Sequence, residues 1–188
     1  SFGSLFMPMN AETLVEVTRN GGGKATPPEK RGLSFALLDL RADVASARIF
    51  TSGFNDYLHL VKQDGAWRIA NVLWQPPSPA GVANADADTV AVAKAVADLV
   101  AALSGGDAAR LEALVHPEAA LRTVRQSPSG RTFIIEGNRD SVLAAAAEKA
   151  VPPMTGAESK VLDVYDTIAS ARTTSATAVY YWHLAKQK

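Results

Sequence analysis

Two tyrosine–histidine pairs are the residues of this sequence best suited to chemistry. Tyr57 and His59 stand two positions apart, and Tyr181 and His183 repeat this spacing 124 positions later. Residues two apart on a β-strand share one face, so each pair can present a phenol and an imidazole together. Imidazole titrates near neutral pH and serves as an acid or a base. These four residues are therefore candidate catalytic groups, and equally candidates for half-buried sheet residues or for a contact between domains.

Asn71 adds an amide inside an otherwise apolar segment. The segment follows Asp64-Gly65, a dipeptide typical of a two-residue hairpin turn. A two-residue turn places Leu58 opposite Asn71 and a three-residue turn places Tyr57 there, so the sequence leaves the face of Asn71 open. The predicted ligand-binding residues are Tyr57, His59, Asn71, Tyr181 and His183.

Composition excludes several classes of protein. The 188 residues contain 19 Lys+Arg and 19 Asp+Glu, so no basic field favours nucleic acid. The absence of cysteine excludes a disulfide scaffold and a thiol nucleophile. Three dispersed histidines predict no metal site, and no motif predicts a cofactor. No apolar run approaches the ~20 residues that span a bilayer, and the compartment stays open between cytoplasm and periplasm.

An internal repeat organises the chain. A shift of 124 places lays residues 38–48 on residues 162–172 and residues 57–63 on residues 181–187. Eleven of the 28 positions from 37 to 64 are identical under this shift. Asp39, Arg48, Asp163 and Arg172 recur in it, and we expect them to be solvated or paired surface charges. The repeat predicts two copies of one domain.

Hydrophobic spacing and turn residues predict the elements that position these side chains. Helices are expected over residues 10–20, 86–105, 107–116 and 138–150. Strands are expected over 33–41, 44–51, 54–62 and 66–74 in the first copy, and over 159–166, 168–174 and 177–186 in the second. A further hairpin is expected within 121–136. Helices that pack on antiparallel sheets make an α+β protein.

The segment from Asp56 to Trp74 resembles the C-terminal hairpin of the NTF2-like superfamily, and within it the SnoaL-like and putative lumazine-binding group. The resemblance implies two cone-shaped α+β barrels, each a curved antiparallel sheet packed on helices around a pocket. It implies a small-molecule-binding protein with no recognisable catalytic set. One alternative is an isomerase, dehydratase or cyclase acting on a cyclic carbonyl compound, with His59 or His183 as acid/base and the neighbouring tyrosine as oxyanion donor. Another is a sheet-mediated association module.

The predicted domains are a first copy over 1–75 that lacks its N-terminal helices, a proline-rich linker over 76–86, and a second copy over 87–188 that lacks its last strand. One long helix pair, from Asp88 to His116, is available for two sheets, so one sheet should be left bare. We expect a small apolar or aromatic ligand as partner, and a homo-oligomer, swapped segments or further residues to complete the bare copy. Neither nucleic acid nor a membrane is expected as a partner.

Overall fold

The computed structural model describes residues 9–78, 85–152 and 154–186, which form an α+β fold as predicted. The first half contains α1 (Ala11–Arg19), a 3-10 turn (Pro28–Lys30), β1 (Leu33–Arg41), β2 (Val44–Thr51), β3 (Asn55–Gln63) and β4 (Ala66–Gln75). The second half contains α2 (Ala85–Gly105), α3 (Ala108–Leu114), β5 (Ala120–Gln126), β6 (Thr132–Asn138), α4 (Arg139–Ala147), β7 (Glu158–Tyr165), β8 (Ile168–Thr174) and β9 (Val179–Ala185).

The strands form three separate antiparallel sheets in the described part of the chain: β1-β2-β3-β4, β5-β6 and β7-β8-β9. The expected α+β fold with curved antiparallel sheets and helices is confirmed, but no hydrogen-bonded ladder among the described residues joins one sheet to another and closes a barrel. In the described part of the chain, helices pack on β7–β9, and α4 also contacts β5 and β6. Each large sheet is a meander of adjacent hairpins, the arrangement that short turns such as Asp64-Gly65 favour.

The two repeated stretches fold alike. A bulge interrupts the β1–β2 pairing between Leu37 and Asp39, and the β7–β8 pairing has its bulge between Val161 and Asp163, 124 positions later. The backbone N–H of Lys62 donates to the carbonyl of Asp43 over 2.8 Å, and that of Lys186 donates to the carbonyl of Thr167 over 2.7 Å. The division into domains over 1–75 and 87–188 stays a prediction, and residues 79–84 of the predicted linker lie outside the described residues.

Side-chain caps begin three of the helices. Asn10 accepts from the backbone N–H of Thr13 over 2.8 Å at the start of α1, and Asp107 caps α3 by accepting from Arg110. Asn138 and Ser141 form a reciprocal capping box at α4. Each cap satisfies a backbone donor that a helix otherwise leaves without a partner, so these polar residues fix where the helices begin.

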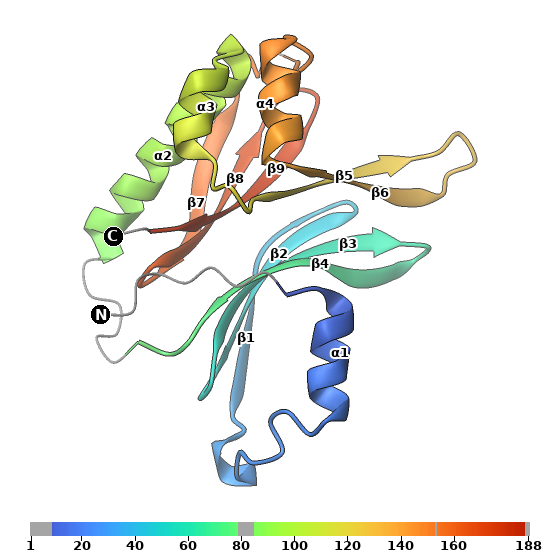
Figure 1. Ribbon diagram of the computed structural model, residues 1–188, viewed down its shortest axis with the longest axis vertical. Helices are drawn as coiled ribbons and strands as arrows, with labels where there is room; N and C mark the ends of the chain where they lie inside the picture. The colour runs from blue at the N-terminus through green and yellow to red at the C-terminus, as the bar shows by residue number, and fades with distance from the viewer. Residues whose placement is uncertain (1–8, 79–84, 153, 187–188) are drawn as a thin grey trace.

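The helices, β7–β9 and β1–β4 lie in successive layers (Figure 1). Helix α2 packs on β7 and β8, and α3 and α4 pack beside it, so the helices cover one face of β7–β9. The opposite face of β7–β9 lies against β1–β4. The apolar core sits between the helices and β7–β9, and its buried members are Ala102, Leu103, Leu111, Ala146 and Met154. Tyr180 and Trp182 of β9 pack against this core, so side chains fill the space beneath the helices.

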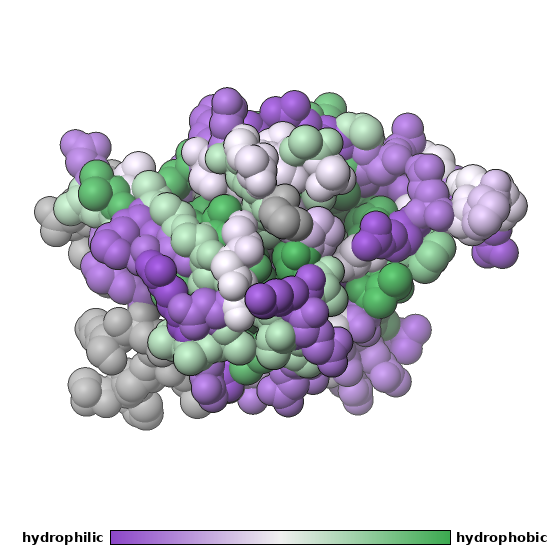
Figure 2. Space-filling view, turned by 90° about the horizontal axis from the view of Figure 1, so that it is seen from above, coloured by the Kyte–Doolittle hydropathy of each residue, from purple (hydrophilic) through white to green (hydrophobic). Residues whose placement is uncertain are grey.

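Among the described residues, no helix packs closely on the face of β1–β4 that points away from β7–β9. Three cross-strand rows of side chains, read from the strand registers, form this surface, which we call the open face: Phe35-Ile49-Asp56-Trp74, Leu37-Ala47-Leu58-Val72 and Leu40-Ala45-Leu60-Ile69. Phe35 is 59% exposed, Leu37 52% and Ile69 60%. Ala45, Ala47 and Leu58, on the two central strands, are buried. The expectation that one sheet is left bare stays a prediction. Seen from the helical end, by contrast, hydrophobic residues are scattered among hydrophilic ones (Figure 2).

Candidate functional site

The sheets β1–β4 and β7–β9 pack against each other, and we call this packing the inter-sheet contact. It brings together the residues predicted to carry the chemistry. Tyr57 and His59 lie on the face of β3 that points toward β7–β9, and Tyr181 and His183 lie on the facing side of β9. The repeat therefore packs against itself about an approximate twofold axis. The Oγ atoms of Ser46 and Ser170, equivalent residues of the two copies, hydrogen-bond to each other over 3.0 Å.

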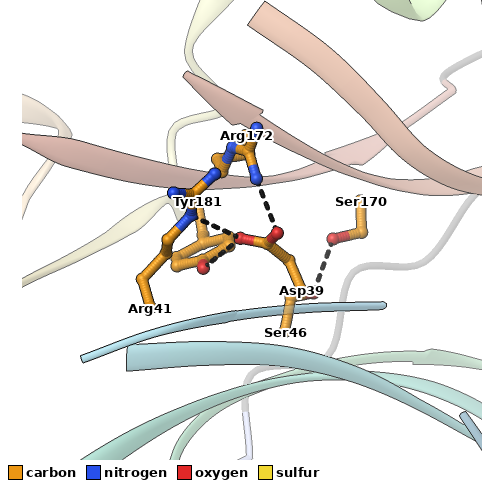
Figure 3. Close-up of polar contacts among 6 residues, drawn as sticks. All are labelled: Asp39, Arg41, Ser46, Ser170, Arg172 and Tyr181. Atoms are coloured by element: carbon orange, nitrogen blue, oxygen red, sulfur yellow. Dashed lines mark hydrogen bonds and ion pairs between the residues drawn. The ribbon is translucent and has the colours of Figure 1, made fainter. Parts of the chain in front are cut away.

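Two equivalent clusters of charged groups flank these serines. In one, Arg172 Nη1 donates to Asp39 Oδ1 over 2.5 Å and the Tyr181 hydroxyl donates to Asp39 Oδ2 over 2.6 Å (Figure 3). Arg41 also pairs with Asp39. In the other, Asp163 Oδ2 accepts from Arg48 Nη1 over 2.6 Å and from the Tyr57 hydroxyl over 2.7 Å.

These recurring charges were expected at the surface, and the structure instead places them, paired, between the two sheets. The side chains of Asp39 and Arg172 are each 15% exposed. Charged residues are rarely withdrawn from water unless they are paired and hydrogen-bonded, and each carboxylate here has two donors of that kind. Each copy supplies the carboxylate of one cluster and the arginine and tyrosine that hydrogen-bond to the carboxylate of the other, while Arg41 comes from the same copy as Asp39.

The pKa values agree with this assignment of charge. Burial raises the pKa of Asp39, but hydrogen bonds from Tyr181 and Arg172 outweigh it and hold that pKa below its usual value. Burial, followed by the hydrogen bond to Asp163, raises the pKa of the Tyr57 phenol. The pKa of the Tyr181 phenol is raised in the same way, by burial and then by the hydrogen bond to Asp39. Both phenols therefore remain protonated donors rather than bases.

The two histidine rings stack on each other, with centroids 3.5 Å apart and an interplanar angle of 31°. Both residues keep partial exposure, but their Nε2 atoms are buried and have no hydrogen-bond partner among the described residues. Burial, and secondarily the charge of Arg122, lowers the pKa of His59 to about 3. Burial and the neighbouring His59 lower the pKa of His183. Both imidazoles are neutral near pH 7.

Asn71 belongs to this contact and orients His183. Its Oδ1 accepts from Arg122 over 3.2 Å, so its Nδ2 is the donor toward His183 Nδ1, 3.0 Å away. That donation leaves the proton of neutral His183 on Nε2. Asn71 pairs with His59 across the strands, which neither predicted register allowed. The Asp64-Gly65 turn has two residues, but a bulge beyond Leu60 shifts the pairing by one residue.

All five predicted ligand-binding residues thus meet at one place, and their recorded contacts are with protein groups. Their assignment to ligand binding stays a prediction, as does catalysis by His59, His183, Tyr57 and Tyr181. No group of three or more His, Cys, Asp or Glu side chains in the described part could hold a metal ion. Within the same residues, no helix combines the length and the apolar character needed to cross a membrane.

Two small cavities open at the surface of the described part of the chain. One of about 330 Å³ opens at the edge of the inter-sheet contact and is lined by Arg48, Phe50, Thr89 and residues 161–165. Its charged groups, Arg48 and Asp163, are already paired with each other. The second, of about 400 Å³, lies against the turn of the β5–β6 hairpin. Ligand pockets usually measure about 300–1,000 Å³, so both are at the small end of that range.

The open face carries one ionisable group that the sequence analysis did not single out. Asp56 stands in the row between Ile49 and Trp74, and burial raises its pKa to about 6. Every other member of the three rows is apolar. A carboxyl group with a perturbed pKa on an apolar surface is a candidate functional residue. Its signal in the sequence is an acid at an alternating position, two before Leu58 and four before Leu60, where the pattern calls for an apolar residue.

Comparison with known proteins identifies a family that is similar to the first half of the chain. No curated protein and no solved structure matches the sequence. Residues 3–75 match the model of a family described as putative lumazine-binding. That segment includes all four strands of the open face and the hairpin from Asp56 to Trp74 that carried the resemblance. The match confirms the resemblance, and residues 3–75 are the part of the chain that is similar to the putative lumazine-binding family.

Proposed function

We propose that this chain binds a small planar heteroaromatic molecule, such as a pteridine-2,4-dione, on the open face of β1–β4. The observation that carries the proposal is the single carboxyl group of Asp56 among eleven apolar neighbours in the three rows of that face. Ligand sites usually combine an apolar surface with a few polar groups that set orientation. The family description over residues 3–75 supports the same class of ligand.

Asp56 is suited to the polar edge of such a ring. A pteridine-dione presents an N–H beside a carbonyl. A protonated carboxylic acid donates one hydrogen bond and accepts another, so it complements that edge. Burial raises the pKa of Asp56 to about 6, which brings the protonated form into the mildly acidic range. Trp74, its cross-strand neighbour and 41% exposed, offers an aromatic surface for the ring.

The test is a titration of the full chain with lumazine, followed by tryptophan fluorescence, at pH 5 and pH 7.5. We expect saturable binding that is tighter at pH 5. Asp56→Leu should weaken binding at pH 5 about tenfold, because one hydrogen-bonding group is worth about 1.4 kcal/mol. Asp56→Asn keeps a donor and an acceptor, so it should retain affinity and lose the pH dependence.

Two control variants locate the site. Asp64→Asn changes an exposed acid in the turn at the other end of β3 and should bind lumazine as the wild type does. Phe50→Leu alters the cavity at the edge of the inter-sheet contact and should also leave affinity unchanged. Weakening by Phe50→Leu instead of Asp56→Leu would place the ligand in that cavity. Absence of saturable binding, or equal affinity of wild type and Asp56→Leu, would refute the proposal.

A further inference from the structure

The second half of the chain shows how a sheet of this design is covered. Helix α2 packs on β7 and β8, and the core residues of α2, α3 and α4 lie against that face. The positions equivalent to Leu37 and Leu58 of the open face are Val161 and Trp182, 124 residues later. Trp182 packs against the core beneath the helices. The same surface, more apolar in the first half, has no such cover among the described residues.

Among the described residues, no helix packs beside α1 in the way that α3 packs beside α4. Helix α1 corresponds to α4 in its Asn cap and in its place before a sheet. In α4, Val142 and Leu143 pack against the core, and α4 contacts α3. In α1, Leu14 is 54% exposed and Val15 46%. Figure 1 places α1 on the side of β1–β4 away from β7–β9, so these exposed residues belong to the same side of the molecule as the open face.

One charge indicates the orientation of what binds there. In the second half, Lys186 follows β9 and its Nζ donates to Asp88 Oδ1 over 2.8 Å, which ties the first turn of α2 to the sheet. The equivalent residue of the first half is Lys62, whose backbone makes the corresponding hydrogen bond to Asp43. In the described part of the chain, no acidic side chain forms an ion pair with Lys62. The open face thus has a cation where β7–β9 receives an acidic helix start.

From these observations we infer that the open face is a docking site for a helical hairpin of the α2–α3 kind. The partner segment has an acidic first turn, an apolar face for β1–β4, and a second short helix for the apolar side of α1. The acidic turn lies at Lys62. The inference concerns the same face as the proposed function but does not rest on ligand binding.

A peptide of residues 85–116, added to the full chain, tests this inference. The peptide contains no tryptophan, so fluorescence and NMR signals of Trp67 and Trp74 report on the open face alone, with Trp182 reporting on β7–β9. We expect 1:1 saturable binding that shifts the indole signals of Trp67 and Trp74 but not that of Trp182. Leu37→Asp should weaken binding at least fiftyfold, since it places a charge in the apolar contact.

Charge exchange tests the orientation. Lys62→Glu should weaken peptide binding two- to fivefold, the range of an exposed ion pair. A peptide with Asp88→Lys should recover that loss with the Lys62→Glu chain and not with the wild type. Lys149→Glu, an equal charge change at the end of α4, should have no effect.

Four outcomes overturn the inference. They are absence of binding, a response confined to Trp182, binding indifferent to Leu37→Asp and Lys62→Glu, and a chain dimer in sedimentation that the peptide cannot displace. In the last case a second copy occupies the face. The lumazine titration depends on Asp56 and not on Lys62, so failure of one proposal leaves the other measurable.

Discussion

Acid should destabilise this protein through its stacked histidines. Burial lowers the pKa of His59 to about 3 in the folded state, whereas the unfolded value is 6.5. The unfolded chain therefore binds more protons as the pH falls below 6.5. The stability contributed by the neutral ring is fully present above that pH and is lost as the pH falls toward 3. His183, whose pKa is lowered as well, acts in the same direction.

The size of the effect follows from the two pKa values. At pH 4, protonation of the unfolded form removes about 3.4 kcal/mol for His59 alone, at about 1.36 kcal/mol for each pH unit below 6.5. This is an upper value, because the residue keeps part of its surface in solvent. Small domains have a stability of about 5–15 kcal/mol, so the loss is a substantial fraction of the total.

Urea unfolding at pH 7.5, 6, 5 and 4, followed by tryptophan fluorescence, measures this loss. The double variant His59→Gln/His183→Gln should lose about 3 kcal/mol less than the wild type between pH 7.5 and pH 4. His116→Gln, outside the inter-sheet contact, should follow the wild type. The single variants serve where the double variant does not fold. Equal pH slopes in wild type and histidine variants would show that the stacked rings do not carry the acid sensitivity.

Four further substitutions test the packing, and Gly105→Ala serves as a control for one of them. Asp39→Asn and Asp163→Asn should each cost about 1–3 kcal/mol in urea unfolding at pH 7.5, because each leaves a partly buried arginine without its carboxylate; a cost for only one of them would contradict the equivalence of the two clusters. Leu111→Ala, at a fully buried core position, should cost about 2–5 kcal/mol, and a smaller loss would mean that the core under the helices collapses to fill the space. Gly106→Ala should lower the Tm, because its φ is +68° and a Cβ would lie 2.8 Å from a backbone oxygen of α4, whereas Gly105→Ala meets open space and should not.

The local structure of this chain was predictable because its turn and cap residues act over short distances. Asp64-Gly65 forms the two-residue turn that its type favours, and Asn138 caps α4 where the sequence placed a helix start. The repeat also carried information, since equivalent residues of the two stretches take equivalent places in their sheets.

The way in which the two large sheets pack against each other could not be predicted from the sequence. Alternation groups Tyr57 with His59 on one face but does not say what that face meets, because a ligand, water and a second sheet all accept such side chains. The bulge that pairs Asn71 with His59 has no marker in the residue types around it. Asp56 was missed for a similar reason: its unusual environment depends on Ile49 and Trp74, which neighbour it only across the strands.

The reciprocal arrangement of the inter-sheet contact restricts how the two copies can diverge. Asp39 works with Tyr181, and Asp163 works with Tyr57, so neither copy contains a complete cluster. A substitution in one half therefore alters the surroundings of a charged group in the other half, and a compensating substitution must lie in that other half. The two halves can differ freely on their outer faces, but residues on the surfaces that meet must change together.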